Sequence, residues 1–284
     1  MSELDAGRPA DEVTAPDAAP DDADGVDLDE RPLRVENLRK EFGGITAVDG
    51  ATFDVEAGTL TGLIGPNGAG KSTTFDLITG FHRVDGGRVL FNGEDITDLP
   101  PHAVANRGLV RTFQIARELG EMTVLENMML APQGQDGEAL WRSVLPGTRS
   151  GVVDQERAQL DRVHEMLDFF DIDHLAEEYA GNLSGGQRKL LELARALLTD
   201  PDVLLLDEPF AGVNPTLESR LLDHIHELRN QGYTFLLVEH DMDLIMEHCE
   251  RVIVMHQGRI LTEGTPAEVR ANEEVIEAYL GGNV

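Results

Sequence analysis

The residues with the clearest chemistry form a glycine-rich run directly after an apolar segment. They follow the pattern G-x-x-x-x-G-K-[ST] of a phosphate-binding loop, and they are Gly65, Pro66, Asn67, Gly68, Ala69, Gly70, Lys71, Ser72 and Thr73. A buried strand that ends in this turn and opens a helix would aim backbone N–H groups and a positive helix end at one point. Lys71 would then reach the β- and γ-phosphates of a nucleotide, and the Ser72 hydroxyl would bind Mg²⁺. A chance glycine-rich turn is the alternative, since the chain holds 29 glycines.

Further polar groups follow two other apolar runs. Residues 203–206 are continuously apolar, as is typical of a parallel strand covered on both faces, and they lead into Asp207 and Glu208. A similar run at 234–238 leads into His240 shortly after its end. Ligands bind at the carboxyl ends of the strands in such sheets. A solvated strand end for the acidic pair, and an ordinary turn residue at His240, are the alternatives.

Periodicity predicts the elements that must position these groups. Alternating or apolar runs indicate strands at 33–42, 52–55, 59–64, 88–91, 108–114, 203–206 and 234–238, and hairpins that turn at 92–93 and 257–258. Helical spacing indicates helices at 71–79, 98–106, 122–130, 154–170, 184–198 and 216–229, followed by C-terminal helices from 265 to about 280. The segments at 122–130 and 154–170 form a helical lobe inserted between two halves of an α/β core.

Charge and composition limit the partners. The 284 residues include 53 Asp and Glu against 23 Lys and Arg, a formal net charge of -30, which argues against nucleic acid as the main partner. Lysine occurs only at positions 40, 71 and 189, a composition that resembles proteins from salt-loving organisms. We expect the fold to require high salt, because the screening length falls from about 10 Å at 0.1 M to about 3 Å at 1 M. An ordinary acidic, solvated surface is the alternative.

Several other features of the sequence predict structure or location rather than chemistry. Residues 1–31 are rich in Asp, Ala and Pro and predict a disordered acidic tail. No apolar run approaches the roughly 20 residues that span a bilayer, and no signal peptide is indicated. Cys249 is the only cysteine, which makes a cytoplasmic setting natural and predicts a small hydrophobic residue on a helix. Trp141 would form a contact patch or pack on its own lobe.

The sequence LSGGQ at 183–187, combined with the phosphate-binding loop and the Asp-Glu-Pro run at 207–209, makes the chain resemble the ATP-binding cassette family. These are the ATPase subunits that power membrane transporters. The resemblance implies an α/β fold: a P-loop NTPase core of the RecA-like type, an antiparallel β subdomain and an inserted α-helical signature subdomain. The implied boundaries are a tail at 1–31, an ATPase domain at 32–264 with its core at 32–114 and 186–264 and its helical subdomain at 115–185, and a C-terminal helical segment at 265–284.

The resemblance also implies a role for each residue of the site. Asp207 would help to hold Mg²⁺, and Glu208 would act as the general base that polarises the attacking water. Gln114 would contact both Mg²⁺ and this water, and His240 would hydrogen-bond the γ-phosphate. Phe42 would stack on the adenine, unless it is a core residue of its strand.

The signature implies a second chain. Its residues are Ser184, Gly185, Gly186 and Gln187. In this family they bind the ATP held by another cassette, so two cassettes in a head-to-tail dimer enclose two ATP molecules. Asn214 lies in the loop that bridges the two sites, where most cassettes carry Asp, and this departure leaves the coupling open. The other implied partners are transmembrane permease subunits at the cytoplasmic face of the cell membrane and, indirectly, a solute-binding protein.

Local stretches resemble the ATPase subunits of branched-chain amino acid importers. They are FGGITAV at 42–48, RTFQ at 111–114, MTVLEN at 122–127, EPFAGVNP at 208–215 and AYLG at 278–281. Cassettes for urea, short amides or lipopolysaccharide share much of this. A soluble cassette ATPase is another class, although the 113 positions from Lys71 to Ser184 leave no room for long coiled coils. A nucleotide-binding regulator without turnover is opposed by the presence of both Lys71 and Glu208.

Overall fold

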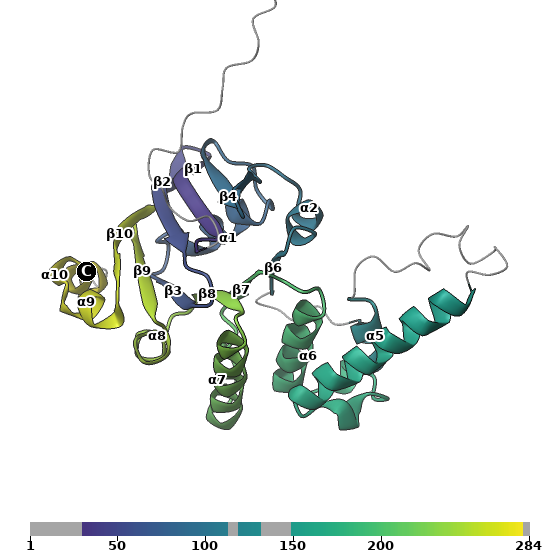
Figure 1. The fold of residues 1–284 in the computed structure, drawn as a ribbon. Helices are drawn as coiled ribbons and strands as arrows, with labels where there is room; N and C mark the ends of the chain where they lie inside the picture. The colour runs from purple at the N-terminus through teal and green to yellow at the C-terminus, as the bar shows by residue number, and fades with distance from the viewer. Residues whose placement is uncertain (1–29, 113–118, 132–148, 281–284) are drawn as a thin grey trace, which may run out of the picture.

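The computed structural model describes residues 30–112, 119–131 and 149–280, and two sheets form its centre (Figure 1). One sheet has four strands in the order β2-β1-β4-β5, and the other has six in the order β10-β9-β3-β8-β7-β6. The predicted class, an α/β fold with an antiparallel sheet beside a mainly parallel one, is confirmed. Trp141, Gln114 and nearly all of the predicted acidic tail lie outside the described residues.

The antiparallel sheet is built from two hairpins. Its strands are β1 (Leu33–Phe42), β2 (Ile45–Val55), β4 (Gly86–Phe91) and β5 (Glu94–Asp95). Asn92 and Gly93 join β4 to β5 with φ values of 49° and 78°, the left-handed pair that a tight hairpin turn requires. The turn predicted from this dipeptide is therefore confirmed.

The six-stranded sheet supplies the edge at which a ligand can bind. Its strands are β3 (Leu60–Ile64), β6 (Leu109–Arg111), β7 (Val203–Asp207), β8 (Thr234–Val238), β9 (Arg251–His256) and β10 (Arg259–Gly264). The pairs β9-β3, β3-β8, β8-β7 and β7-β6 are parallel, so their carboxyl ends meet at one edge. β6 ends at Arg111, before Gln114, the residue to which this strand was predicted to run.

The helices lie on both faces of this sheet and in the helical lobe. They are α1 (Lys71–Ile78), α2 (Pro101–Ala105), α3 (Val124–Met129), α5 (Arg149–Phe169), α6 (Gly185–Leu197), α7 (Pro215–Asn230), α8 (Met242–His248), α9 (Pro266–Ala271) and α10 (Glu273–Leu280). The helix on which Cys249 was predicted is the short α8, which Asp241 caps through the N–H groups of Asp243 and Leu244. The predicted helical position of Cys249 itself is wrong, because α8 ends at His248 and Cys249 follows it in an extended conformation. Within the described ranges, no helix has the length and apolar character to cross a membrane.

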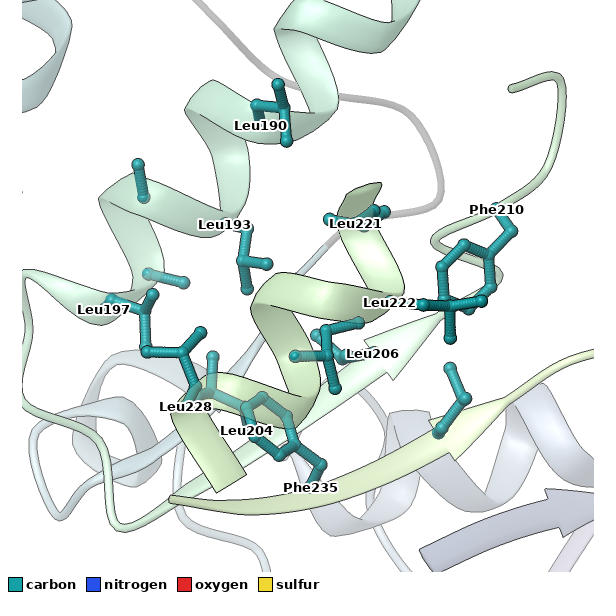
Figure 2. Packing of buried hydrophobic residues seen from close by; sticks show 14 of the residues in the cluster. Leu190, Leu193, Leu197, Leu204, Leu206, Phe210, Leu221, Leu222, Leu228 and Phe235 are labelled. Atoms are coloured by element: carbon teal, nitrogen blue, oxygen red, sulfur yellow. The ribbon is translucent and has the colours of Figure 1, made fainter. Parts of the chain in front are cut away.

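Two hydrophobic clusters cover the opposite faces of the six-stranded sheet. Leu204 and Leu206 of β7 belong to one cluster, which joins α6 and α7 to the sheet (Figure 2). Val203 and Leu205 belong to the other, which lies against α1 and the antiparallel sheet. The alternation explains why this strand reads as continuously apolar. Cys249, just after α8, is buried, and burial raises the pKa of its thiol to about 12.

Candidate functional site

The chemistry-bearing residues collect at the carboxyl ends of neighbouring strands. β3 leads into the glycine-rich loop, β7 ends at Asp207, and β8 is followed closely by His240. Since β8 lies between β3 and β7, the loop, the acidic pair and the histidine share one edge of the sheet. Gln114 would follow β6 at the same edge, but it lies outside the described residues.

Gly70 is the N-cap of α1 and has a backbone conformation that favours glycine. Its φ of 106° is in the left-handed region, and a Cβ there would lie 2.5 Å from the carbonyl oxygen of Ala47. Gly70 has no side chain to cap the helix, so the first-turn N–H groups of α1 are not satisfied by a cap. Ser72 is exposed in that first turn, where a hydroxyl can reach a cation bound beside a phosphate chain.

Lys71 lies against the loop that precedes it. Its Nζ donates to the carbonyl oxygens of Gly65 at 2.7 Å and Pro66 at 3.3 Å. Burial lowers the pKa of the Lys71 ammonium, and the carboxylates of Glu208 and Asp207 oppose this effect. The buried cation is thus held between the loop backbone and the two acids, a position suited to neutralising phosphate oxygens.

Glu208 and His240 form a direct contact. The His240 Nε2 atom lies 2.5 Å from Oε1 of Glu208, and the two side chains are 49% and 14% exposed. Glu208 itself has a φ of 49°, a left-handed conformation that non-glycine residues rarely adopt and that is enriched at functional sites. A carboxylate that is partly shielded and hydrogen-bonded to an imidazole can accept a proton from water.

A buried glutamate supports this pair from behind. Glu239 accepts hydrogen bonds from the backbone N–H of Phe210 at 3.0 Å and from that of His240 at 3.2 Å. Burial raises the pKa of the Glu239 carboxyl, while the two backbone donors oppose this. Glu239 therefore connects the end of β8 to the segment after Glu208 and fixes the backbone of both.

Asp207 is paired with a residue to which the sequence assigned no role. Arg111 Nη2 donates to its Oδ2 at 2.6 Å, and Arg111 Nη1 donates to Asp76 Oδ1 on α1, also at 2.6 Å. The guanidinium lies over the rings of Phe75 at 5.6 Å and Phe81 at 5.8 Å. The sequence held no local signal for this bridge, because Arg111 and Asp207 are 96 positions apart.

The predicted Mg²⁺ ligands have suitable donor atoms. Asp207 provides a buried carboxylate and Ser72 a hydroxyl, and Mg²⁺ prefers oxygen ligands that include one or two carboxylates beside substrate phosphates. With Oδ2 of Asp207 occupied by Arg111, Oδ1 is the oxygen that can face a metal. The residues present therefore fit this ion.

The signature residues lie at the start of α6 and have structural roles there. Ser184 accepts from the N–H of Gln187, whose side chain accepts from the N–H of Ser184, so the two form a capping box. A Cβ on Gly186 would lie 1.8 Å from Leu217 Cδ2 of α7, whereas one on Gly185 would meet nothing within 4 Å. Glycine at 186 thus permits the close approach of two helix N-termini.

Asn214 caps α7 by accepting from the N–H of Leu217 at 3.0 Å. Ser184, Gln187 and Asn214 line one open cavity of about 670 Å³ between the helical lobe and α7. The structure thus brings the signature and the bridging loop together. The helices that these residues begin, α6 and α7, pack on the opposite face of the six-stranded sheet from α1 (Figure 1).

Phe42 is not a core residue. Its side chain, at the end of β1, is 42% exposed and meets His82 edge to face at a centroid distance of 5.3 Å. Lys40 Nζ lies 5.3 Å from the ring centroid. An exposed aromatic ring of this kind is available for stacking on a base.

Comparison with known proteins defines the class. Residues 48–211 match the model of the ABC transporter family, and residues 259–284 match the model described as branched-chain amino acid ATP-binding cassette transporter. The chain belongs to the ABC transporter family and is one of its ATP-binding cassettes, ATPases that bind and hydrolyse ATP. The resemblance inferred from the motifs is confirmed.

Individual relatives cover almost the whole described chain. A probable branched-chain amino acid transport ATP-binding protein of Archaeoglobus fulgidus is 43% identical over 88% of this chain and 95% of its own length. A high-affinity branched-chain amino acid transport ATP-binding protein of Escherichia coli K12 is 42% identical over 88% and 97%. A crystal structure of an ABC transporter cassette in its ADP conformation aligns with a TM-score of 0.75 at 39% identity, covering 88% of this chain and 99% of that one.

Proposed function

We propose that this chain is the ATP-hydrolysing subunit of an importer for branched-chain amino acids. The observation that carries the hydrolytic part is the contact of 2.5 Å between Glu208 and His240 at the sheet edge that also carries the buried Lys71. The names of the relatives and the match of residues 259–284 support the substrate class. Permease subunits would hold the chain at the cytoplasmic face of the membrane.

Within one chain, different residues would bind the phosphates, hold Mg²⁺ and activate the attacking water. The loop N–H groups and Lys71 would bind the β- and γ-phosphates. Mg²⁺, held by Ser72, Asp207 and Gln114, would neutralise charge on the transferred phosphoryl group. Glu208 would take a proton from the attacking water, a contribution of about 10² to 10⁴ in rate. His240 would orient Glu208 and bind the γ-phosphate.

A second cassette would complete each site. Ser184 and Gly185 are exposed at the start of α6, which packs on the opposite face of the six-stranded sheet from α1, the helix that begins at Lys71. The signature is therefore placed to act on a nucleotide bound by another chain. The N–H groups and the positive end of this helix suit a γ-phosphate. Asn214 caps α7 as well as Asp would, which supports an intact bridging loop despite the departure from the family pattern.

Purification from native membranes, combined with uptake assays, tests the proposal. The full chain should co-purify with polytopic membrane proteins, and a strain carrying Lys71→Ala should lose uptake of labelled leucine while its uptake of labelled urea is unchanged. Loss of urea uptake instead would favour the amide transporters. A purely soluble complex with unchanged uptake of both would overturn the importer assignment.

A further inference from the structure

Lys189 contacts the backbone of Glu208 from a different element. It lies in the second turn of α6, and its Nζ donates to the carbonyl oxygen of Glu208 at 3.0 Å. Burial lowers the pKa of the Lys189 ammonium, against the opposing effect of Glu192, Glu239 and Glu208. A half-buried ammonium aimed at one carbonyl is a directed contact rather than a solvated surface charge.

The composition makes this lysine conspicuous. Only three of the 23 basic residues are lysines, and each has a defined partner. Lys71 donates to the glycine-rich loop, and Lys40 pairs with Asp85 at 3.0 Å. An ammonium is a compact point donor, whereas the arginine fork suits planar, two-pronged acceptors. The Lys189 ammonium donates to the Glu208 carbonyl, and a single carbonyl suits a point donor.

The Glu208 backbone needs such support because its conformation is unusual. Glu208 has a φ of 49° and follows the last residue of β7. This left-handed conformation is unfavourable for a residue with a Cβ. Its N–H donates to Val238 O at 2.9 Å, and its carbonyl accepts from Ala211 N at 3.2 Å. The Lys189 ammonium adds a shorter, charge-assisted bond to the same carbonyl.

We propose that Lys189 is a positioning residue for Glu208. It holds the peptide unit after Glu208 and thereby directs the Glu208 carboxylate toward His240 and the attacking water. It also ties the signature helix to the general base of its own chain. This inference rests on the proposed function, in which Glu208 is the base.

In the proposed dimer, the Lys189–Glu208 bond would connect the two nucleotide sites. The first turn of α6 would bind the ATP held by a second cassette, while Lys189, about one turn later on the same helix, contacts the Glu208 that acts on the chain's own ATP. A shift of α6 when the second cassette closes would therefore change the position of Glu208. Such coupling would require α6 to adopt two positions, each favoured by a different nucleotide state.

Steady-state kinetics of the full chain test whether Lys189 contributes to ATP hydrolysis. Lys189→Met keeps the side-chain length and removes the donor, so kcat should fall about tenfold while KM for ATP stays within about twofold, because misplacement of a reacting group affects kcat. Lys189→Arg should recover part of the lost kcat. An unchanged kcat for Lys189→Met would overturn the proposal.

Hydrogen exchange without nucleotide tests the structural half independently of any activity. The peptide spanning residues 207–213 should exchange severalfold faster in Lys189→Met than in the unmodified chain. Arg188→Met is the matched control, since Arg188 Nε donates to Leu183 O from the same helix, and it should leave this peptide unchanged. Equal exchange in Lys189→Met and the unmodified chain would overturn the proposal. If the unmodified chain showed no ATPase activity, only the proposed function would be refuted. The hydrogen-exchange result would still test whether Lys189 stabilises the backbone at Glu208.

Discussion

At the scale of single residues, the site depends on charges that are held by other charges. Lys71, Glu208 and His240 interact with one another or with the backbone between them, and Asp207 is fixed by Arg111. Each of these groups has a defined partner. Each substitution at this edge therefore affects the neighbours of the residue as well as its own chemistry.

Arg111 provides the clearest test of this dependence. Arg111→Met should lower the free energy of unfolding by about 3–5 kcal/mol, because it leaves the buried carboxylate of Asp207 without its cation. The Arg111 and Asp207 side chains are 12% and 6% exposed. Denaturant unfolding at constant high salt measures the change.

An exposed ion pair provides a control for the effect of burial on the stability contributed by Arg111. Arg220 pairs with Asp171 at 2.6 Å, but both side chains are well exposed, so Arg220→Met should change the stability very little. If the two variants lost equal stability, the account of Arg111 as a buried bridge would be wrong.

The contact between His226 and His248 predicts that the folded state loses stability as the pH falls. His226 Nε2 lies 3.0 Å from Nδ1 of His248, and burial, followed by His248, lowers the pKa of His226 from 6.5. Because the folded pKa is lowered, the unfolded chain binds protons more readily below pH 6.5, and stability is lost as pH falls through this range. His226→Gln should show a smaller loss of melting temperature between pH 7 and 5.5.

A control variant is needed because low pH can also destabilise this acidic chain through groups other than His226. His102→Gln, at an exposed position of α2, should follow the unmodified chain. A loss of melting temperature in His226→Gln as large as in the unmodified chain would remove the histidine pair as a cause.

At the scale of elements, the contact between α6 and α7 sets the position of the signature. A Cβ at Gly186 would overlap the Cδ2 end of Leu217, so Gly186→Ala should lower stability by about 1 kcal/mol, the low end for overpacking, because the Leu217 side chain can shift and alanine favours the helix. Thermal and denaturant unfolding measure it. Leu217→Ala in the same chain should restore part of the loss, and Gly185→Ala should not reproduce it. An unchanged stability for Gly186→Ala would show that the helices can separate freely.

The sequence allowed most elements to be predicted, because buried strands and capped helices leave local patterns. The dipeptide Asn92-Gly93 fixed a turn, and the run before Asp207 identified a covered strand. Contacts between distant segments left no such pattern. The Arg111 bridge and the Lys189 bond join residues 96 and 19 positions apart, and the parallel pairing of β9 with β3 is equally non-local. Position in a family motif indicated Glu208 and His240, but not the hydrogen bond between them.

At the scale of the whole molecule, the net charge of -30 is the dominant property. The resulting self-repulsion acts over about 10 Å at 0.1 M salt and about 3 Å at 1 M. We expect circular dichroism to show loss of secondary structure after dialysis from molar salt into dilute buffer. A spectrum unchanged by dialysis would contradict the salt requirement and identify an ordinary acidic surface.

Glu208 is proposed as the general base for hydrolysis of the ATP that Lys71 binds. Single-turnover hydrolysis by the full chain carrying Glu208→Gln tests this role directly, because the amide preserves size and removes the proton acceptor. ATP should stay bound while the hydrolysis rate falls by about 10² to 10⁴. Hydrolysis at the rate of the unmodified chain would contradict the account.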